Sequence, residues 1–306
     1  MPAPSMHDGQ LPTDVGLVRG LLADQQPRWA DLPIAEVASS GTVNALYRLG
    51  ADLVVRLPIV DHDPGEIAKD RRWLPSLAPH LPVAVPEVVA VGEPALGYPW
   101  TWGVYRWIEG RDATAVTLDP PAELGLAHDL ARVVRALQDI DHGGGPQPGR
   151  ATYGRGAPLA GFDEPVRRSL EHIDAVGGLL DVPAAGDVWA QALAAPVWSS
   201  APVWVHGDLM PGNLLLAEGR LVAVIDWGAL GVGDPACELM PAWNLFTAPG
   251  RAAYRSALGV DDAMWLRGRG WALLQAVMAL PYYLDTNPGM VAVARRTLAE
   301  LLAGGA

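Results

Sequence analysis

One short segment, residues 203–235, places Asp208, Asn213 and Asp226 beside two apolar runs. The runs 203–205 and 221–225 are rich in β-branched residues and separated by turn residues, which predicts two buried strands. Asp208 follows the first strand, Asp226 ends the second, and Asn213 lies between them. If the two strands are neighbours, all three side chains emerge at one end of the sheet. Such oxygen ligands suit Mg²⁺, which takes one or two protein carboxylates and leaves its other positions to water and phosphates.

The spacing of these residues is specific. Asp208 and Asn213 are separated as the catalytic aspartate and the metal-binding asparagine are in the protein-kinase catalytic loop, and Asp226 stands where a second metal-binding aspartate is required. The alternative is that each residue caps a turn or ends a strand. Independent caps have no reason to keep this order and spacing, so phosphoryl transfer is the favoured interpretation.

The sequences HGDLMPGN and VIDWGALGVGDP resemble the signature of the aminoglycoside phosphotransferase family, small-molecule kinases that share the protein-kinase fold. The resemblance is strong in this segment and extends more loosely over most of the chain. It implies that Asp208 orients the acceptor hydroxyl and accepts its proton, and that Asn213 and Asp226 hold the metal. It also implies that His206 braces the loop.

The implied architecture is α+β and protein-kinase-like, with two lobes. The nucleotide-binding lobe is expected over 1–106, with a five-stranded antiparallel sheet and one main helix. The helical lobe with the catalytic and acceptor sites is expected over 107–306. Apolar runs predict the five strands and the helix at 34–37, 45–49, 53–57, 85–91, 100–107 and 64–78.

The turn SSGTVN between the first two strands is small and rich in hydroxyl groups. Its amides, with Ser40, Gly41 and Thr42, are candidates for binding nucleotide phosphates, because Gly41 lets the backbone come close. An ordinary hairpin is the alternative at this position.

A kinase-like third strand normally carries a lysine that contacts the α and β phosphates. Here the strand is LVVRLP, and the only lysine of the chain is Lys69, so Arg56 is the candidate. Arginine holds phosphate oxygens through its planar fork, so the replacement is workable. Glu66 and Asp70 on the following helix are its possible acidic partners, and we favour Asp70 because KDRRWL resembles a run of the family. The alternative places both acids on a solvated helix face.

The segment YRWIEG resembles the hinge between the lobes. The backbone of Arg106 and Ile108, with Trp107 between them, is expected at the adenine edge. A buried aromatic strand end is the alternative.

Helical periodicity dominates after residue 120, and the stretch 143–200 is expected to influence acceptor specificity. Candidate acceptor contacts are Asp234, Glu238, Tyr282 and Asp285. A Gly-Asp-Pro turn also predicts that Asp234 caps a helix with Pro235 at its first position, and core packing explains tyrosines, so these alternatives are favoured.

Composition narrows the partners. The 306 residues carry a formal charge of -12 and a pI near 4.9, which argues against nucleic acid and is compatible with a cationic small molecule. Cys237 is the only cysteine, so an intramolecular disulfide is excluded. No secretory signal or membrane span is visible, so a cytoplasmic location is expected. The oligomeric state stays open.

We therefore predict transfer of a phosphoryl group from ATP or GTP, with Mg²⁺, to a hydroxyl of an aminoglycoside-like antibiotic. Another kinase acceptor is the nearest alternative: a macrolide, a peptide antibiotic, a sugar, choline or a metabolite. A metal-dependent phosphoesterase and a nucleotide-binding protein without transfer are more distant ones.

Overall fold

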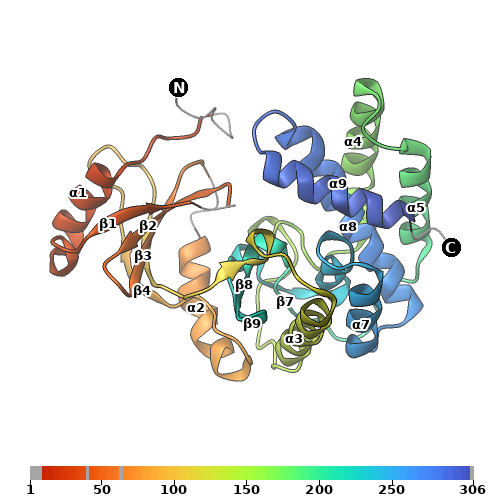
Figure 1. Cartoon of the computed structure of the whole chain (residues 1–306), viewed down its shortest axis with the longest axis horizontal. Helices are drawn as coiled ribbons and strands as arrows, with labels where there is room; N and C mark the ends of the chain where they lie inside the picture. The colour runs from red at the N-terminus through yellow and green to blue at the C-terminus, as the bar shows by residue number, and fades with distance from the viewer. Residues whose placement is uncertain (1–8, 39–40, 62–64, 304–306) are drawn as a thin grey trace. The chain divides into compact units, whose positions relative to one another are not determined.

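The computed structural model describes residues 9–38, 41–61 and 65–303, and its chain divides into two compact units (Figure 1). The first unit takes the described residues of Met1–Pro79 together with Ala84–Gly110. The second takes His80–Val83 and the described residues of Arg111–Ala306. The predicted lobe boundary after residue 106 lies just before this division.

The first unit is built on one antiparallel sheet. Its five strands run in the order β1-β2-β3-β5-β4, so the predicted five-stranded antiparallel sheet is confirmed. The helices and strands are α1 (Val15–Gln25), β1 (Ile34–Val37), β2 (Asn44–Leu49), β3 (Leu53–Pro58), α2 (Glu66–Leu77), β4 (Val88–Gly92) and β5 (Trp102–Arg106).

The strands differ from their predicted bounds where the backbone cannot pair. The strand expected over 85–91 begins at Val88, after Pro86, which has no N–H to donate to a ladder. Helix α1 begins one residue later than a Thr13 cap would give, because the Asp14 side chain accepts from Leu17 N at 2.7 Å. Thr13 instead accepts a hydrogen bond from the Tyr47 hydroxyl at 2.9 Å.

The second unit is mostly helical and holds two small sheets. Its helices are α3 (Pro120–Gln138), α4 (Asp163–Val176), α5 (Val182–Ala194), α6 (Pro241–Asn244), α7 (Ala248–Leu258), α8 (Asp262–Tyr283) and α9 (Pro288–Ala303). Its strands are β6 (Arg111–Asp112), β7 (Val203–Val205), β8 (Leu214–Ala217), β9 (Arg220–Val224) and β10 (Gly231–Gly233). Helix α8 packs against α4, α5 and α9, which are shown together in Figure 1.

The two strands around the polar segment are not neighbours, so the condition under which all three side chains leave one end of a shared sheet is not met. β7 pairs with β10, whereas β9 pairs with β8, which in turn pairs with β6. The reason is that the chain after Asp208 turns back as β8, and β8 pairs with β9 in place of β7. The polar side chains must therefore meet through the loop and not through a shared sheet.

Buried tryptophans fill the core of the second unit. Trp189, Trp204, Trp227 and Trp271 are at most 2% exposed. Burying an indole is favourable when its N–H finds a partner. Trp204 donates to the Asp141 carbonyl at 3.2 Å and Trp227 to the Val224 carbonyl at 2.9 Å. These bonds hold β7 and the end of β9 in place. Within the described residues, no helix has both the length and the apolarity to cross a membrane.

Candidate active site

His206 fixes the loop that follows β7. Its ring is 1% exposed and packs edge-on against Trp227, with 4.7 Å between ring centroids. Nδ1 accepts from the Asp208 N–H at 3.1 Å, so Nε2 carries the proton that faces the Ile225 carbonyl at 3.1 Å. The histidine therefore ties the loop to the end of β9, as expected of a brace.

Asn213 joins Asp208 to the residue before Asp226. Its Nδ2 donates to the Asp208 carbonyl at 2.8 Å and to Asp208 Oδ2 at 3.2 Å, and its own carbonyl accepts from Ile225 N at 2.9 Å. The short helix η6 (Pro211–Asn213) ends at this residue and makes the turn. Because the amide nitrogen is turned to Asp208, the oxygen Oδ1 is the atom that would bind a cation.

Asp226 has a left-handed backbone, with φ of 62° and ψ of 68°, just before helix η7 (Trp227–Ala229). Aspartate adopts this conformation more readily than most residues, but it is uncommon outside glycine and concentrates at functional sites. The conformation turns the chain sharply at the end of β9. The negative charge of Asp226 acts on Asp208, so the two carboxylates are close enough to interact.

Asp208 sits in a partly buried position between charges of both signs. Burial raises the pKa of its carboxyl group, the Arg155 guanidinium opposes this rise, and the Asp226 carboxylate adds to it. Asp208 Oδ1 accepts from Gln275 Nε2 at 3.0 Å and lies 3.6 Å from Arg155 Nη2. The side chain keeps 28% exposure, so a small molecule can reach it.

No sequence pattern indicated Arg155 or Gln275 as a neighbour of Asp208. Arg155 lies between two glycines in an irregular loop, and Gln275 is the polar residue within an apolar stretch of α8. The arginine between two glycines and the glutamine in an apolar stretch are both visible in the sequence, but neither pattern indicates Asp208 as the partner.

The donor set fits a magnesium ion. One carboxylate and one amide oxygen, beside a second carboxylate, are what Mg²⁺ takes from a protein when water and phosphate supply the rest. In the described part of the chain, no group of three or more His, Cys, Asp or Glu side chains could enclose a metal. A closed, all-protein cage of those ligands is thus absent from that part.

Glu238 lies inside the protein, below the loop. It is 1% exposed, and its Oε1 accepts from Gly207 N at 2.7 Å. Burial raises the pKa of this carboxyl group to about 7, with backbone hydrogen bonds from Gly207 and His206 opposing the rise. This burial does not suit the predicted acceptor contact, and the hydrogen bond gives Glu238 a place in supporting the loop.

Asp234 also has both carboxylate oxygens engaged within the protein. It caps the short helix η8 (Pro235–Leu239) through Ala236 N at 3.0 Å, as the Gly-Asp-Pro sequence predicts. Its Oδ2 accepts from Arg267 Nε at 2.7 Å, and both side chains of this pair are 7% exposed. An acceptor ammonium group would have to displace Arg267, so the predicted contact does not suit this placement either.

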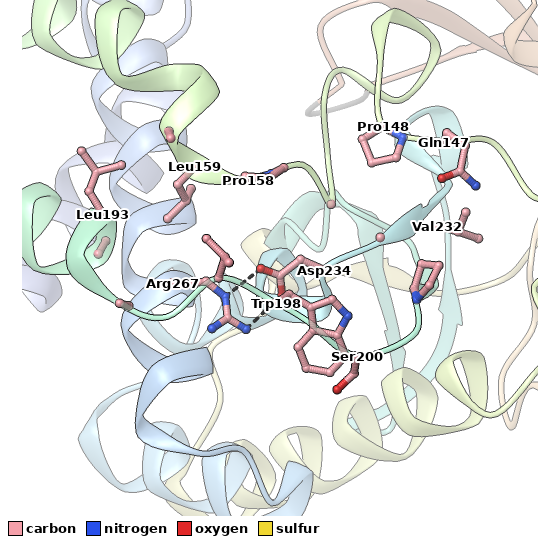
Figure 2. Close-up of a pocket in the computed structure, with 17 residues that line it drawn as sticks. Gln147, Pro148, Pro158, Leu159, Leu193, Trp198, Ser200, Val232, Asp234 and Arg267 are labelled. Atoms are coloured by element: carbon pink, nitrogen blue, oxygen red, sulfur yellow. Dashed lines mark hydrogen bonds and ion pairs between the residues drawn. The ribbon is translucent and has the colours of Figure 1, made fainter.

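The Asp234–Arg267 pair forms part of a separate, mostly apolar pocket of about 210 Å³ (Figure 2). Figure 2 shows the two side chains facing each other, with Trp198 beside the guanidinium, whose carbon is 5.9 Å from that ring centroid. Asp208 does not line this pocket.

Tyr282 and Asp285 lie at the carboxyl end of α8 and in the turn after it. Tyr282 is 57% exposed and stacks edge-on with Tyr283, so the core-packing alternative is wrong for this tyrosine. Two helical turns separate Tyr282 from Gln275, which places both on one face of α8. Asp285 is exposed. Their contact with an acceptor stays a prediction.

In the first unit, Arg56 on β3 is held by two acids of α2. Its Nη2 lies 2.9 Å from Glu66 Oε2, and its Nη1 lies 3.7 Å from Asp70 Oδ2. Asp70 also accepts from the Tyr105 hydroxyl at 3.0 Å. Both acids are buried, so the solvated-face alternative is wrong. Asp70 is thus one acidic partner of Arg56, as expected, and Glu66 is a second partner with the shorter contact.

The other predicted nucleotide residues are placed as follows. Ser40 lies outside the described residues, whereas Gly41 and Thr42 lie in the turn between β1 and β2. Arg106 N donates to the Glu87 carbonyl at 3.0 Å and Trp107 N to the Asp52 carbonyl at 2.8 Å. Those two N–H groups are therefore used inside the unit.

Ile108 follows them and is the third residue of the predicted hinge. Within the described chain, its backbone N–H and C=O make no hydrogen bond. Of the three predicted hinge residues, Ile108 is thus the best placed to meet a ligand through its main chain.

An antiparallel sheet unit, a helical unit and a His-Gly-Asp loop with its asparagine and following aspartate define a protein-kinase-like phosphotransferase that acts on an alcohol group. The family model described as "Phosphotransferase enzyme family" matches residues 34–274. The chain belongs to this family, and the resemblance to aminoglycoside phosphotransferases is confirmed.

Individual relatives are more distant. An aminoglycoside 3'-phosphotransferase from Escherichia coli is 44% identical over 43 residues, which span 14% of this chain and only 16% of that protein. A solved aminoglycoside phosphotransferase in complex with GDP and kanamycin has a TM-score of 0.73 at 21% identity, covering 95% of this chain and 99% of its own. A macrolide 2'-phosphotransferase type I has a TM-score of 0.63 at 19% identity, covering 94% and 98%. These structures are similar to the chain in fold.

Proposed function

We propose that this protein transfers the γ-phosphoryl group of ATP or GTP to a hydroxyl group of an aminoglycoside-like antibiotic. The observation that supports this most is the link between Asp208, Asn213 and the residue before Asp226. Asn213 donates to Asp208 and accepts from Ile225 N, so the loop with Asp208 and Asn213 is hydrogen-bonded to the residue before Asp226.

Each group has a role in this proposal. Asp208 aligns the acceptor hydroxyl and takes its proton, while Asn213 and Asp226 hold Mg²⁺, which when bound supplies positive charge for the phosphate oxygens. In the first unit, Arg56 binds phosphate oxygens, and Glu66 with Asp70 keeps its guanidinium in place. The turn with Gly41 and Thr42 contacts phosphate, and the Ile108 backbone meets the base. The relative bound to GDP and kanamycin supports this choice of ligands.

A macrolide-like acceptor is the second candidate, since the family's fold does not by itself fix the acceptor. The similarity to a macrolide 2'-phosphotransferase supports the same choice.

The test is an acceptor panel with Mg-ATP and, in parallel, Mg-GTP. Aminoglycosides, macrolides, peptide antibiotics and sugars are incubated with the protein, and mass detection reports an added phosphoryl group. We expect a phosphorylated antibiotic whose formation requires the nucleotide. Hydrolysis of a generic phosphate ester by the protein and metal alone would instead favour a phosphoesterase. Nucleotide binding with no product across the panel would contradict the proposed transfer.

A further inference from the structure

The Arg155 side chain lies against the proposed catalytic carboxylate. Its Nη2 is 3.6 Å from Asp208 Oδ1, and the side chain is 12% exposed. The guanidinium carbon lies 5.4 Å from the Trp271 ring centroid, within the range of a cation–π contact. A buried arginine costs free energy unless something compensates its charge, and Asp208 is the acid in contact with it.

The loop that carries Arg155 is seated on the catalytic segment by close backbone contacts. The carbonyl of Gly156 accepts from Asp234 N at 2.9 Å, which fixes the loop beside β10. A Cβ atom on Gly233 would lie 2.5 Å from that carbonyl oxygen, so only glycine allows this approach. Gly207 has a φ of +80°, and its Cβ would lie 2.8 Å from the Cβ of Arg155. The backbone is thus shaped to bring Arg155 next to the residue before Asp208.

The two oxygens of Asp208 are held by different groups. Oδ2 accepts from Asn213 Nδ2 at 3.2 Å, and Oδ1 accepts from Gln275 Nε2 at 3.0 Å. The 3.6 Å contact of Arg155 is too long for a hydrogen bond, so the arginine acts on Oδ1 through its charge. Arg155 Nε is buried and has no hydrogen-bond partner in the described part of the chain. The Arg155 Nε–H is therefore not fixed by a hydrogen bond.

The other ionisable groups near Asp208 cannot replace the positive charge of Arg155. Asp226 and Glu238 are acids, whose charge repels the Asp208 carboxylate, and the His206 ring accepts from the Asp208 N–H through Nδ1. Arg155 is thus the cation that compensates a site with several carboxyl groups.

We infer that Arg155 is a positioning residue that holds the Asp208 carboxylate in place for the acceptor hydroxyl, together with Gln275 and Asn213. The inference rests on the proposed function for the role of Asp208. It adds a residue to the site that no sequence motif marks.

The first test compares kcat and KM for Arg155→Met, Arg155→Lys and the matched control Arg150→Met. Arg150 is an exposed arginine of the same loop. We expect Arg155→Met to lower kcat by about 10- to 100-fold through misplacement of Asp208, with KM for the nucleotide within twofold. Arg155→Lys should recover part of kcat, and the control should behave as wild type. A kcat within twofold of wild type for Arg155→Met would overturn the inference, as would equal losses in the Met and Lys variants.

The second test needs no turnover. The melting temperature is measured for Arg155→Met in the wild-type and in the Asp208→Asn background. If the two side chains are coupled, Arg155→Met lowers the melting temperature only where Asp208 is charged. The same shift in both backgrounds would overturn the inference even in an active enzyme. A coupled pair in a protein without transfer activity would instead count against the proposed function.

Discussion

Two arginine–aspartate pairs of the second unit lie near the same loop and differ in how complete they are. Arg267 and Asp234 form a closed pair: Nε and Nη2 reach the two carboxylate oxygens at 2.7 and 3.3 Å, and Nη1 donates to the Pro196 carbonyl at 2.7 Å. Arg155 and Asp208 are 3.6 Å apart, with Arg155 Nε without a partner among the described residues. The closed pair has its hydrogen bonds satisfied inside the protein, whereas the open pair keeps groups that can meet a substrate.

The difference follows from exposure and from competition for the aspartate. Both members of the closed pair are 7% exposed, so water does not compete and the fork geometry is complete. Asp208 is 28% exposed and divides its oxygens among Asn213, Gln275 and Arg155. A pair with all its hydrogen bonds made stabilises the fold, whereas a pair that keeps groups without partners is a better candidate for function.

The largest stability effect should come from opening the closed pair. Arg267→Met leaves Asp234 buried without its cation, so the free energy of unfolding should fall by about 3–5 kcal/mol. Urea denaturation measures it, and kcat per folded molecule should change little. Arg168→Met is the control, because its partner Glu164 is 82% exposed and such a surface pair contributes about 1 kcal/mol or less. Equal losses in both variants would remove the distinction between the two pairs.

The next largest effect on stability concerns Glu238, which supports the loop before Asp208 through its bond to Gly207 N. Its pKa is raised from the usual 4.5 to about 7, so between these values the folded state holds a proton that the unfolded state releases. The contribution to stability is complete below pH 4.5 and is lost as the pH rises through about 7, by about 3 kcal/mol in all. Denaturation across this range should show the decline in wild type but not in Glu238→Gln. A parallel decline in the variant would assign the effect to another group.

The smallest effect should come from a third pair, in which only the aspartate is buried. Arg220 Nε and Nη2 each lie 2.7 Å from an Asp129 oxygen, and the side chains are 62% and 5% exposed. Burial acts to raise the pKa of Asp129, but hydrogen bonds from Arg220, Arg132 and Leu221 N outweigh it and lower the pKa. Its contribution is therefore present above the usual pKa of 3.8 and is lost as the pH falls through the folded value. Arg220→Met should lower the stability at pH 7 slightly and flatten the acid limb of the stability curve. No change in that limb would contradict the assignment.

The sequence predicted the arrangement of the loop 206–213 because its parts are local. His206, Asp208 and Asn213 interact within one turn of chain, so their spacing alone specifies the arrangement. The family's fold could be predicted in the same way, since the alternation of apolar strands and the later helical periods are properties of short windows.

What the sequence did not predict depends on distant segments. Arg155 and Gln275 reach Asp208 from a loop and a helix far along the chain, and no short pattern encodes such a meeting. The pairing of β7 with β10 was missed for the same reason. Asp234 and Glu238 were candidate acceptor contacts, with capping favoured for Asp234, because the sequence shows their charge but not their burial. Their burial is set by the packing of α8 against η8.

The central claim is that Asp208 performs the chemistry on a loop whose neighbours hold the metal. The most direct measurement is phosphoryl transfer by Asp208→Ala, with nucleotide binding measured in the same sample. We expect transfer to fall by about 10³-fold while the Kd for Mg-nucleotide stays within a few-fold of wild type. A variant that turns over its acceptor at a near-normal rate would contradict the claim.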